Sequence, residues 1–183
     1  DDAASADRRF RFFVPEHEME MCGHATLGAA WLLRRRGEAS ATELRIETLS
    51  GPVRAIFVGD VLFGAGCGRV FEGEMSDLFR SLQRIAALPN DTWIFCAHEY
   101  TRANLAFAAV IEPDNAAIAE RQAVLADGAP SVPFRLVGER ASNVFLRCDQ
   151  PAVRERVADH VQRPLAHPAD VFAALRQWKN VHV

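Results

Sequence analysis

Residues 59–100 read GDVLFGAGCGRVFEGEMSDLFRSLQRIAALPNDTWIFCAHEY. The apolar run at 61–63 predicts a short strand, and the glycine-rich residues 64–68 predict a tight loop after it. Apolar residues recur at helical spacing from 74 to 88, which predicts an amphipathic helix. Residues 92–96 are mostly apolar and indicate a buried strand. This part of the chain therefore predicts a β-α-β unit.

The chain beyond His98 is predicted to be mostly helical. Helical patterns cover 100–111, 114–126, 151–161 and 168–178, whereas 127–138 (DGAPSVPFRLVG) is predicted to be a loop. Prolines stand at or just before three helix starts, where a missing N–H costs nothing, at Pro113, Pro151 and Pro168.

The chain before residue 59 follows a different pattern. Charged and aromatic residues alternate over 8–15 and predict a strand, and 24–36 predicts a helix that stops at Gly37. Two further strands are expected at 43–48 and 53–58, separated by a Ser-Gly-Pro turn. The order β-α-β-β, then β-α-β, then a helical tail predicts an α+β fold.

Composition excludes several classes of function. The chain has 183 residues, of which 49% are hydrophobic and 25% charged, and its formal net charge is −3. An acidic balance disfavours nucleic-acid binding, and no apolar run approaches the ~20 residues of a membrane span. The acidic first seven residues are not expected to be a signal peptide. Four cysteines without a Cys-x-x-Cys pair indicate reduced thiols and predict a cytoplasmic protein.

Two groups of residues are candidates for binding or catalysis. His24 follows Gly23 at a predicted helix start, where backbone N–H groups favour an anion, although a solvent-facing histidine explains the pattern equally well. Asp60 and His98 are metal-ligand types, but without context they indicate a turn aspartate and a surface histidine.

A third pair lies near the end of the chain. Arg176 and Lys179 are three residues apart and share one helix face, where they suit the carboxylates of a ligand. A basic helix end that complements the helix dipole is the alternative explanation of this pair.

The strings RFFVPEHEMEMCGHATLGAAWLL (11–33) and ETLSGPV (47–53) resemble the PhzF-like isomerases. The resemblance covers about residues 8–56 and implies an internal β-α-β-β piece of a diaminopimelate-epimerase-like fold. It places Gly23 and His24 in the substrate pocket, with His24 as the catalytic candidate. The catalytic glutamate of that family belongs upstream of Arg8, and the seven residues there do not supply its motif. We therefore expect no isomerase activity.

Residues 59–183 resemble hydroxyacylglutathione hydrolase, or glyoxalase II, through the 59–100 segment and through ERASNVFLR (139–147) and PADVFAALRQWKN (168–180). The resemblance implies the C-terminal part of a metallo-β-lactamase fold over 59–112 and a helical domain over 113–183, after a PhzF-like fragment over 1–58. The implied reaction is hydrolysis of S-D-lactoylglutathione to glutathione and D-lactate at a binuclear zinc or iron centre.

The resemblance also implies roles for individual residues. Asp60 and His98 match metal ligands of the family. The substrate-binding positions, which contact glutathione, are matched by Arg69, Tyr100, Arg176 and Lys179. Phe71 stands where some relatives carry a tyrosine. The expected partner is a glutathione thioester, with no nucleic acid and no membrane, and the oligomeric state stays open.

The central metal motif of that family, Thr-His-x-His-x-Asp-His, does not occur among the 183 residues. Two of the seven family ligands remain, too few for two catalytic ions that each need about three protein ligands. We therefore expect the chain alone to be inactive as a hydrolase. Two alternatives stay open, a PhzF-like isomerase fragment centred on His24 and a non-catalytic glutathione-binding or fusion product.

Overall fold

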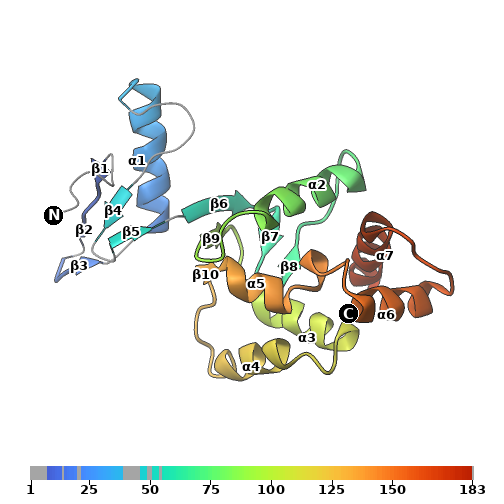
Figure 1. Cartoon of the computed structure of the whole chain (residues 1–183). Helices are drawn as coiled ribbons and strands as arrows, with labels where there is room; N and C mark the ends of the chain where they lie inside the picture. Colours follow the sequence, from blue (N-terminus) through green and yellow to red (C-terminus); the bar gives the residue numbers. More distant parts are fainter. Residues whose placement is uncertain are drawn as a thin grey trace. The chain divides into compact units, whose positions relative to one another are not determined.

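The computed structural model describes residues 8–13, 15–19, 22–38, 46–48, 51–53 and 55–182. The chain contains both helices and strands (Figure 1), so the predicted α+β class is confirmed. The chain forms two compact units, Asp1–Phe57 and Val58–Val183. The two units are described separately below.

The described residues of the first unit form two small sheets and one helix. Its larger sheet has the order β1-β4-β5, with β1 parallel to β4 and β4 antiparallel to β5, and β2 pairs antiparallel with β3. The elements are β1 (Arg8–Arg9), β2 (Phe12–Phe13), β3 (Glu18–Met19), α1 (Gly23–Arg35), β4 (Ile46–Thr48) and β5 (Gly51–Val53).

Helix α1 has well-defined ends. The N–H of Thr26 donates to the Cys22 carbonyl at 2.9 Å, which closes the first turn. Gly37 has a φ of +72° just beyond the last turn, a conformation that glycine adopts at little cost. The helix predicted at 24–36 is therefore present with its bounds shifted by one residue. The placement of the His24 side chain lies outside what the structure describes.

The second unit contains a three-stranded sheet, a hairpin and most of the helices (Figure 1). The sheet order is β10-β9-β6, and β7 pairs antiparallel with β8. The strands are β6 (Ala55–Gly59), whose end lies in this unit, β7 (Leu62–Phe63), β8 (Gly66–Cys67), β9 (Trp93–Cys96) and β10 (Phe134–Arg135). The helices are α2 (Met75–Ala86), α3 (Thr101–Ile111), α4 (Ala116–Val124), α5 (Leu136–Ser142), the 3-10 turn η1 (Val144–Leu146), α6 (Pro151–Val161) and α7 (Pro168–Val181). Among the described residues, no helix is long and apolar enough to cross a membrane.

The core of the second unit lies where the helices meet the hairpin. Helix α3 contacts α4, α6 and β8, and α7 contacts α2, α6 and η1. Side chains from these elements and from β7 and β9 are fully or almost fully buried, including Leu62, Leu82, Ile94, Leu105, Phe107, Phe145, Phe172 and Leu175. Each such side chain contributes ~1.5–3 kcal/mol relative to an exposed position. The hairpin is thus part of a hydrophobic core rather than a surface flap.

The prediction of a loop over 127–138 is wrong for its last residues. Residues 134–135 form β10 against β9, and α5 begins at Leu136. The Leu136 side chain is fully buried, and its N–H donates to the Thr92 carbonyl at 2.9 Å. Tertiary pairing with β9 therefore orders a segment whose glycine and prolines favour a loop in isolation.

Candidate functional site

Two strand ends bring Asp60 and His98 together. Asp60 follows β6 and His98 follows β9, and the Ala97 N–H donates to the Gly59 carbonyl at 3.0 Å between these neighbouring strands. His98 Nε2 lies 3.5 Å from Asp60 Oδ1, and the side chains are 51% and 71% exposed. Two ligands of one tetrahedral zinc are about 3.4 Å apart, given metal–ligand distances of about 2.0–2.1 Å. The pair therefore has the spacing of two ligands on one ion.

Glycines shape the turn that carries Asp60. Gly59 has a φ of +52°, and the Gly68 N–H donates to the Val61 carbonyl at 3.1 Å. A Cβ atom on Gly68 would overlap the carbonyl oxygen of Asp60. Only glycine allows this approach, so the backbone of Asp60 is held against the end of the β7–β8 hairpin.

Aromatic rings fix the position of His98. The imidazole stacks on the Tyr100 ring with centroids 5.0 Å apart and an interplanar angle of 14°. Phe63, at the end of β7, meets Tyr100 edge-on at 5.1 Å and His98 at 6.0 Å. Such ring pairs contribute ~0.5–1.5 kcal/mol beyond area burial. His98 therefore sits in a preformed aromatic setting, with Tyr100 still 49% exposed.

Glu99 is already engaged by a neighbouring loop. Its Oε2 accepts the Ser131 N–H at 2.9 Å, and its Oε1 accepts the Ser131 hydroxyl. Burial alone raises the pKa of this carboxyl, but the hydrogen bonds from Ser131 and Thr101 outweigh it, so the pKa lies below its usual value. The carboxylate is therefore used to hold the loop before β10.

The donor set at this place is small. Within the part of the chain that the structure describes, no group of three or more His, Cys, Asp and Glu side chains could hold a metal ion. Cys96 donates its thiol to the His98 carbonyl at 3.3 Å, and burial raises the pKa of that thiol. The described residues thus offer two ligands, which do not fit a binuclear centre.

Two basic side chains among the predicted substrate-binding residues come from different elements. Arg69 is exposed just after β8. Lys179 is half-buried on α7, where its Nζ donates to the Ala103 carbonyl at 3.4 Å and lies 4.9 Å from the Phe107 ring centre. Burial, together with the charge of Arg176, lowers the pKa of Lys179. Lys179 is therefore tied to the first turn of α3, immediately after Tyr100.

Arg176 has a different environment from Lys179. It is 6% exposed, and its Nη1 donates to the Cys67 carbonyl at 2.9 Å, with the Gly68 carbonyl at 3.5 Å. The guanidinium lies 5.0 Å from the Phe145 ring centre, and Nε has no hydrogen-bond partner among the described residues. Arg176 thus braces the backbone that leads into Arg69.

Three polar residues that hold the β7–β8 hairpin were not predicted from the sequence. Asn104 Nδ2 donates to the Gly64 carbonyl at 3.0 Å, and Asn143 Nδ2 donates to the Gly66 carbonyl at 3.0 Å. Glu139 Oε2 accepts the Ala65 N–H at 2.9 Å. A glycine-rich loop between apolar strands needs partners for its backbone groups, which indicates that such residues exist but not which ones they are.

Models of two protein families match the chain. Residues 99–182 match "Hydroxyacylglutathione hydrolase C-terminus", and residues 1–66 match "Phenazine biosynthesis-like protein". Both resemblances expected from the sequence are confirmed by these matches.

Curated relatives of the larger part are named hydroxyacylglutathione hydrolase. The protein from Aeromonas hydrophila is 52% identical over 130 residues, which cover 69% of this chain and 51% of the relative. The proteins from Nitrosomonas eutropha and Dechloromonas aromatica are each 47% identical, over 68% and 69% of this chain and 51% and 54% of their own lengths. The chain spans about half the length of the curated relatives it matches.

Proposed function

We propose that residues 59–183 form the glutathione-thioester-binding part of a site of the hydroxyacylglutathione hydrolase type. The proposal includes a metallo-β-lactamase-like origin for 59–112 and an epimerase-like origin for the first unit. The observation that carries it is the 3.5 Å approach of His98 and Asp60 from two strand ends. Relatives that share about half of the sequence over this part are named for action on a hydroxyacylglutathione.

The charges around the pair suit such a ligand. Glutathione carries carboxylates, for which arginine and lysine are the natural partners. Arg69 and the exposed face of Tyr100 are proposed as direct contacts, together with Lys179 beside the first turn of α3. Arg176 is proposed to support the site indirectly, because it is buried and donates to the Cys67 carbonyl in the backbone that leads to Arg69.

The binuclear metal centre expected from the resemblance to hydroxyacylglutathione hydrolase does not fit the donors described in this chain. Asp60 and His98 supply two ligands, and no third described His, Cys, Asp or Glu completes a cluster with them. We therefore propose binding of the thioester, and we expect these 183 residues alone to give no hydrolysis above the uncatalysed rate. A glutathione ligand also suits the cytoplasm, where glutathione sets the thiol poise.

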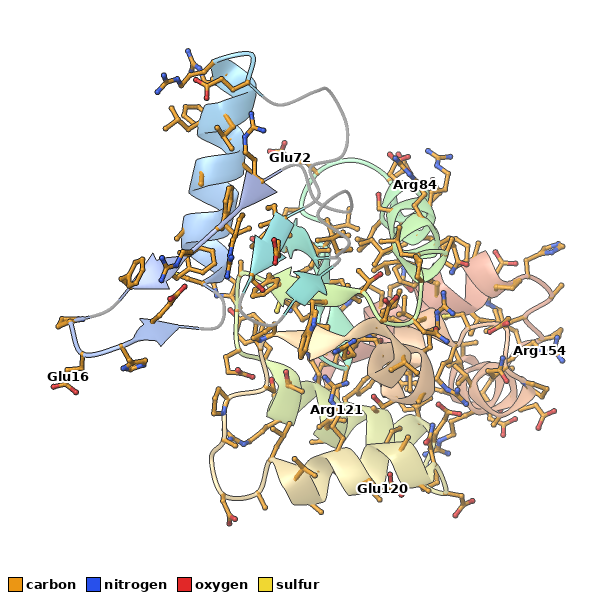
Figure 2. All side chains as sticks on the ribbon, turned by 60° about the vertical axis from the view of Figure 1, so that its left-hand side comes forward. Glu16, Glu72, Arg84, Glu120, Arg121 and Arg154 are labelled. Carbon is orange, nitrogen blue, oxygen red and sulfur yellow. The ribbon has the colours of Figure 1, made fainter. Side chains whose placement is uncertain are left out.

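Calorimetric titration of the full chain with S-D-lactoylglutathione tests the proposal. Lys179→Gln is expected to weaken binding about tenfold, since a charge-assisted contact of ~1.4 kcal/mol is lost. Arg154→Gln on the exposed face of α6 (Figure 2) removes the same charge elsewhere and is expected to leave binding unchanged. Equal losses in both variants, or no heat of binding at millimolar thioester, would contradict the proposal.

A second candidate concerns the first unit. The match of residues 1–66 to the phenazine biosynthesis-like family favours an anion-binding pocket of the isomerase type at the start of α1. We propose that anion binding in this pocket depends on His24, and we expect no isomerase turnover. If His24→Ala left the binding of small carboxylates by the chain unchanged, this candidate would fail.

A further inference from the structure

We infer that Glu139 is the positioning residue of the Asp60–His98 site. It acts through the site hairpin, by which we mean residues 60–69 with strands β7 and β8. The inference rests on the proposed function in treating Asp60 and His98 as a binding site, whereas the anchoring of the hairpin rests on contacts alone.

The site hairpin transmits the position of its tip to its open end. Leu62 pairs with Cys67 and Phe63 with Gly66, which leaves a two-residue turn at Gly64 and Ala65. Asp60 and Arg69 flank the open end of the same hairpin. Because a shift of register at a two-residue turn moves every residue of both strands, the tip sets where Asp60 and Arg69 lie.

The tip has a conformation that needs support. Ala65 has a φ of +53°, in the left-handed region that residues with a Cβ rarely adopt. Its N–H donates to Glu139 Oε2 at 2.9 Å, and both residues are fully buried. An unpaired N–H at this depth would be costly, so the carboxylate stabilises this turn specifically.

Neighbouring side chains complete the support around Glu139. Asn143 Nδ2 donates to Glu139 Oε2 at 2.8 Å and to the Gly66 carbonyl at 3.0 Å, so it bridges the carboxylate and the hairpin. Asn104 holds the Gly64 carbonyl from α3. The tip is therefore fixed from two helices, α3 and α5, at three consecutive residues.

An ion pair with Arg121 holds the Glu139 carboxylate in place under the tip. Glu139 Oε2 accepts from the Ala65 N–H and from Asn143 Nδ2, and Oε1 forms an ion pair with the guanidinium of Arg121 on α4 (labelled in Figure 2). Burial raises the pKa of Glu139, and Arg121, Asn143 and Ala65 act against that rise. A glutamine whose oxygen replaced Oε2 would turn its N–H₂ donor toward the Arg121 guanidinium, so the ion pair would be lost and the side chain would be pushed away from Ala65.

The same hairpin also contacts the other half of the site. Phe63, the last residue of β7, packs against the rings of His98 and Tyr100 at 6.0 and 5.1 Å. A displaced tip would move Phe63 and Asp60 together. Glu139 is thus placed to set the separation of Asp60 from His98 without touching either.

Nuclear magnetic resonance of the full chain tests this inference with Glu139→Gln and a matched control. Glu120→Gln makes the same change on the exposed face of α4 (Figure 2). Glu139→Gln is expected to shift the Ala65 amide and, with it, the amides of 60–69 and the ring signals of His98. It is also expected to weaken S-D-lactoylglutathione binding at least fivefold. Glu120→Gln is expected to do neither.

Each outcome decides one of the two claims. A folded Glu139→Gln protein with unchanged His98 signals and unchanged thioester binding would overturn the positioning role and leave the proposed function standing. If the unaltered chain bound no thioester while Glu139→Gln still shifted 60–69 and His98, the proposed function would fail and the positioning role would stand. If Glu139→Gln does not fold, the scalar coupling between the Ala65 amide nitrogen and the Glu139 carboxyl carbon, which their hydrogen bond transmits, is measured in the unaltered chain. Its absence would overturn the inference.

Discussion

Gly68 shows how one residue without a side chain can place a functional group. A Cβ there would overlap the Asp60 carbonyl oxygen, so Gly68→Ala must move backbone rather than a flexible side chain. We expect a loss of ~1–3 kcal/mol in the free energy of unfolding, measured with urea. Gly138→Ala in α5 is the control, because a Cβ there meets no atom within 4 Å. An equal loss in both variants would contradict this reading of the turn.

Glu99 gives a prediction about pH. Its pKa in the folded chain is below the usual 4.5, because hydrogen bonds from Ser131 and Thr101 outweigh the effect of burial. A carboxyl group whose pKa is lowered by folding stabilises the folded chain at pH values above its usual pKa. This contribution is lost as the pH falls through the lower pKa of the folded chain. The stability difference between the unaltered chain and Glu99→Gln should therefore shrink between pH 6 and pH 3. A difference that grows on acidification would refute the prediction.

The candidate site was only partly predictable at the level of residues. Asp60 and His98 came from a resemblance, and the structure brings them within 3.5 Å because adjacent strands end side by side. Glu139 could not be found, since a buried glutamate on a short helix has the same local pattern as an exposed one. Arg176 and Lys179 share a helix face, yet they bind different elements, and the sequence has no signal for that difference.

At the scale of elements, an ion pair ties η1 to the end of α3. Arg147 donates from Nε and Nη2 to the two carboxylate oxygens of Glu112 at 2.7 and 2.9 Å, and Glu112 is 7% exposed. Glu112→Ala leaves the partly buried guanidinium of Arg147 with only the Arg140 carbonyl as a partner, so we expect a loss of about 1.5–3 kcal/mol in unfolding free energy. Asp77→Ala breaks the exposed pair with Arg80 and should cost less than ~1 kcal/mol. Comparable losses in Glu112→Ala and Asp77→Ala would contradict the stronger contribution of the Glu112–Arg147 pair.

The helices were easier to predict than the strands. Apolar periodicity and the prolines at 151 and 168 place α6 and α7 close to their observed starts. The strand expected at 53–58 corresponds to the end of β5 and most of β6, whereas α5 was missed altogether. Short strands and α5 depend on tertiary pairing, such as Leu136 with Thr92, which a local pattern does not contain.

At the scale of the whole molecule, the two units should differ in stability. A unit of about 60 residues buries only ~60% of its unfolded surface, and larger domains bury more. The first unit ends at residue 57, whereas the second extends from 58 to 183. We expect hydrogen exchange in urea, followed by mass spectrometry, to expose peptides of 8–38 at lower denaturant than peptides of 101–182. A single transition shared by both sets of peptides would contradict the division.

The most direct test of the central claim is to map where S-D-lactoylglutathione binds on the intact chain by amide chemical shifts. We expect chemical-shift changes for the amides of Arg69, His98 and Tyr100 and in the first turn of α3, with none at the start of α1. Shifts confined to residues 23–26, or none at millimolar thioester, would contradict the claim that residues 59–183 bind the glutathione thioester.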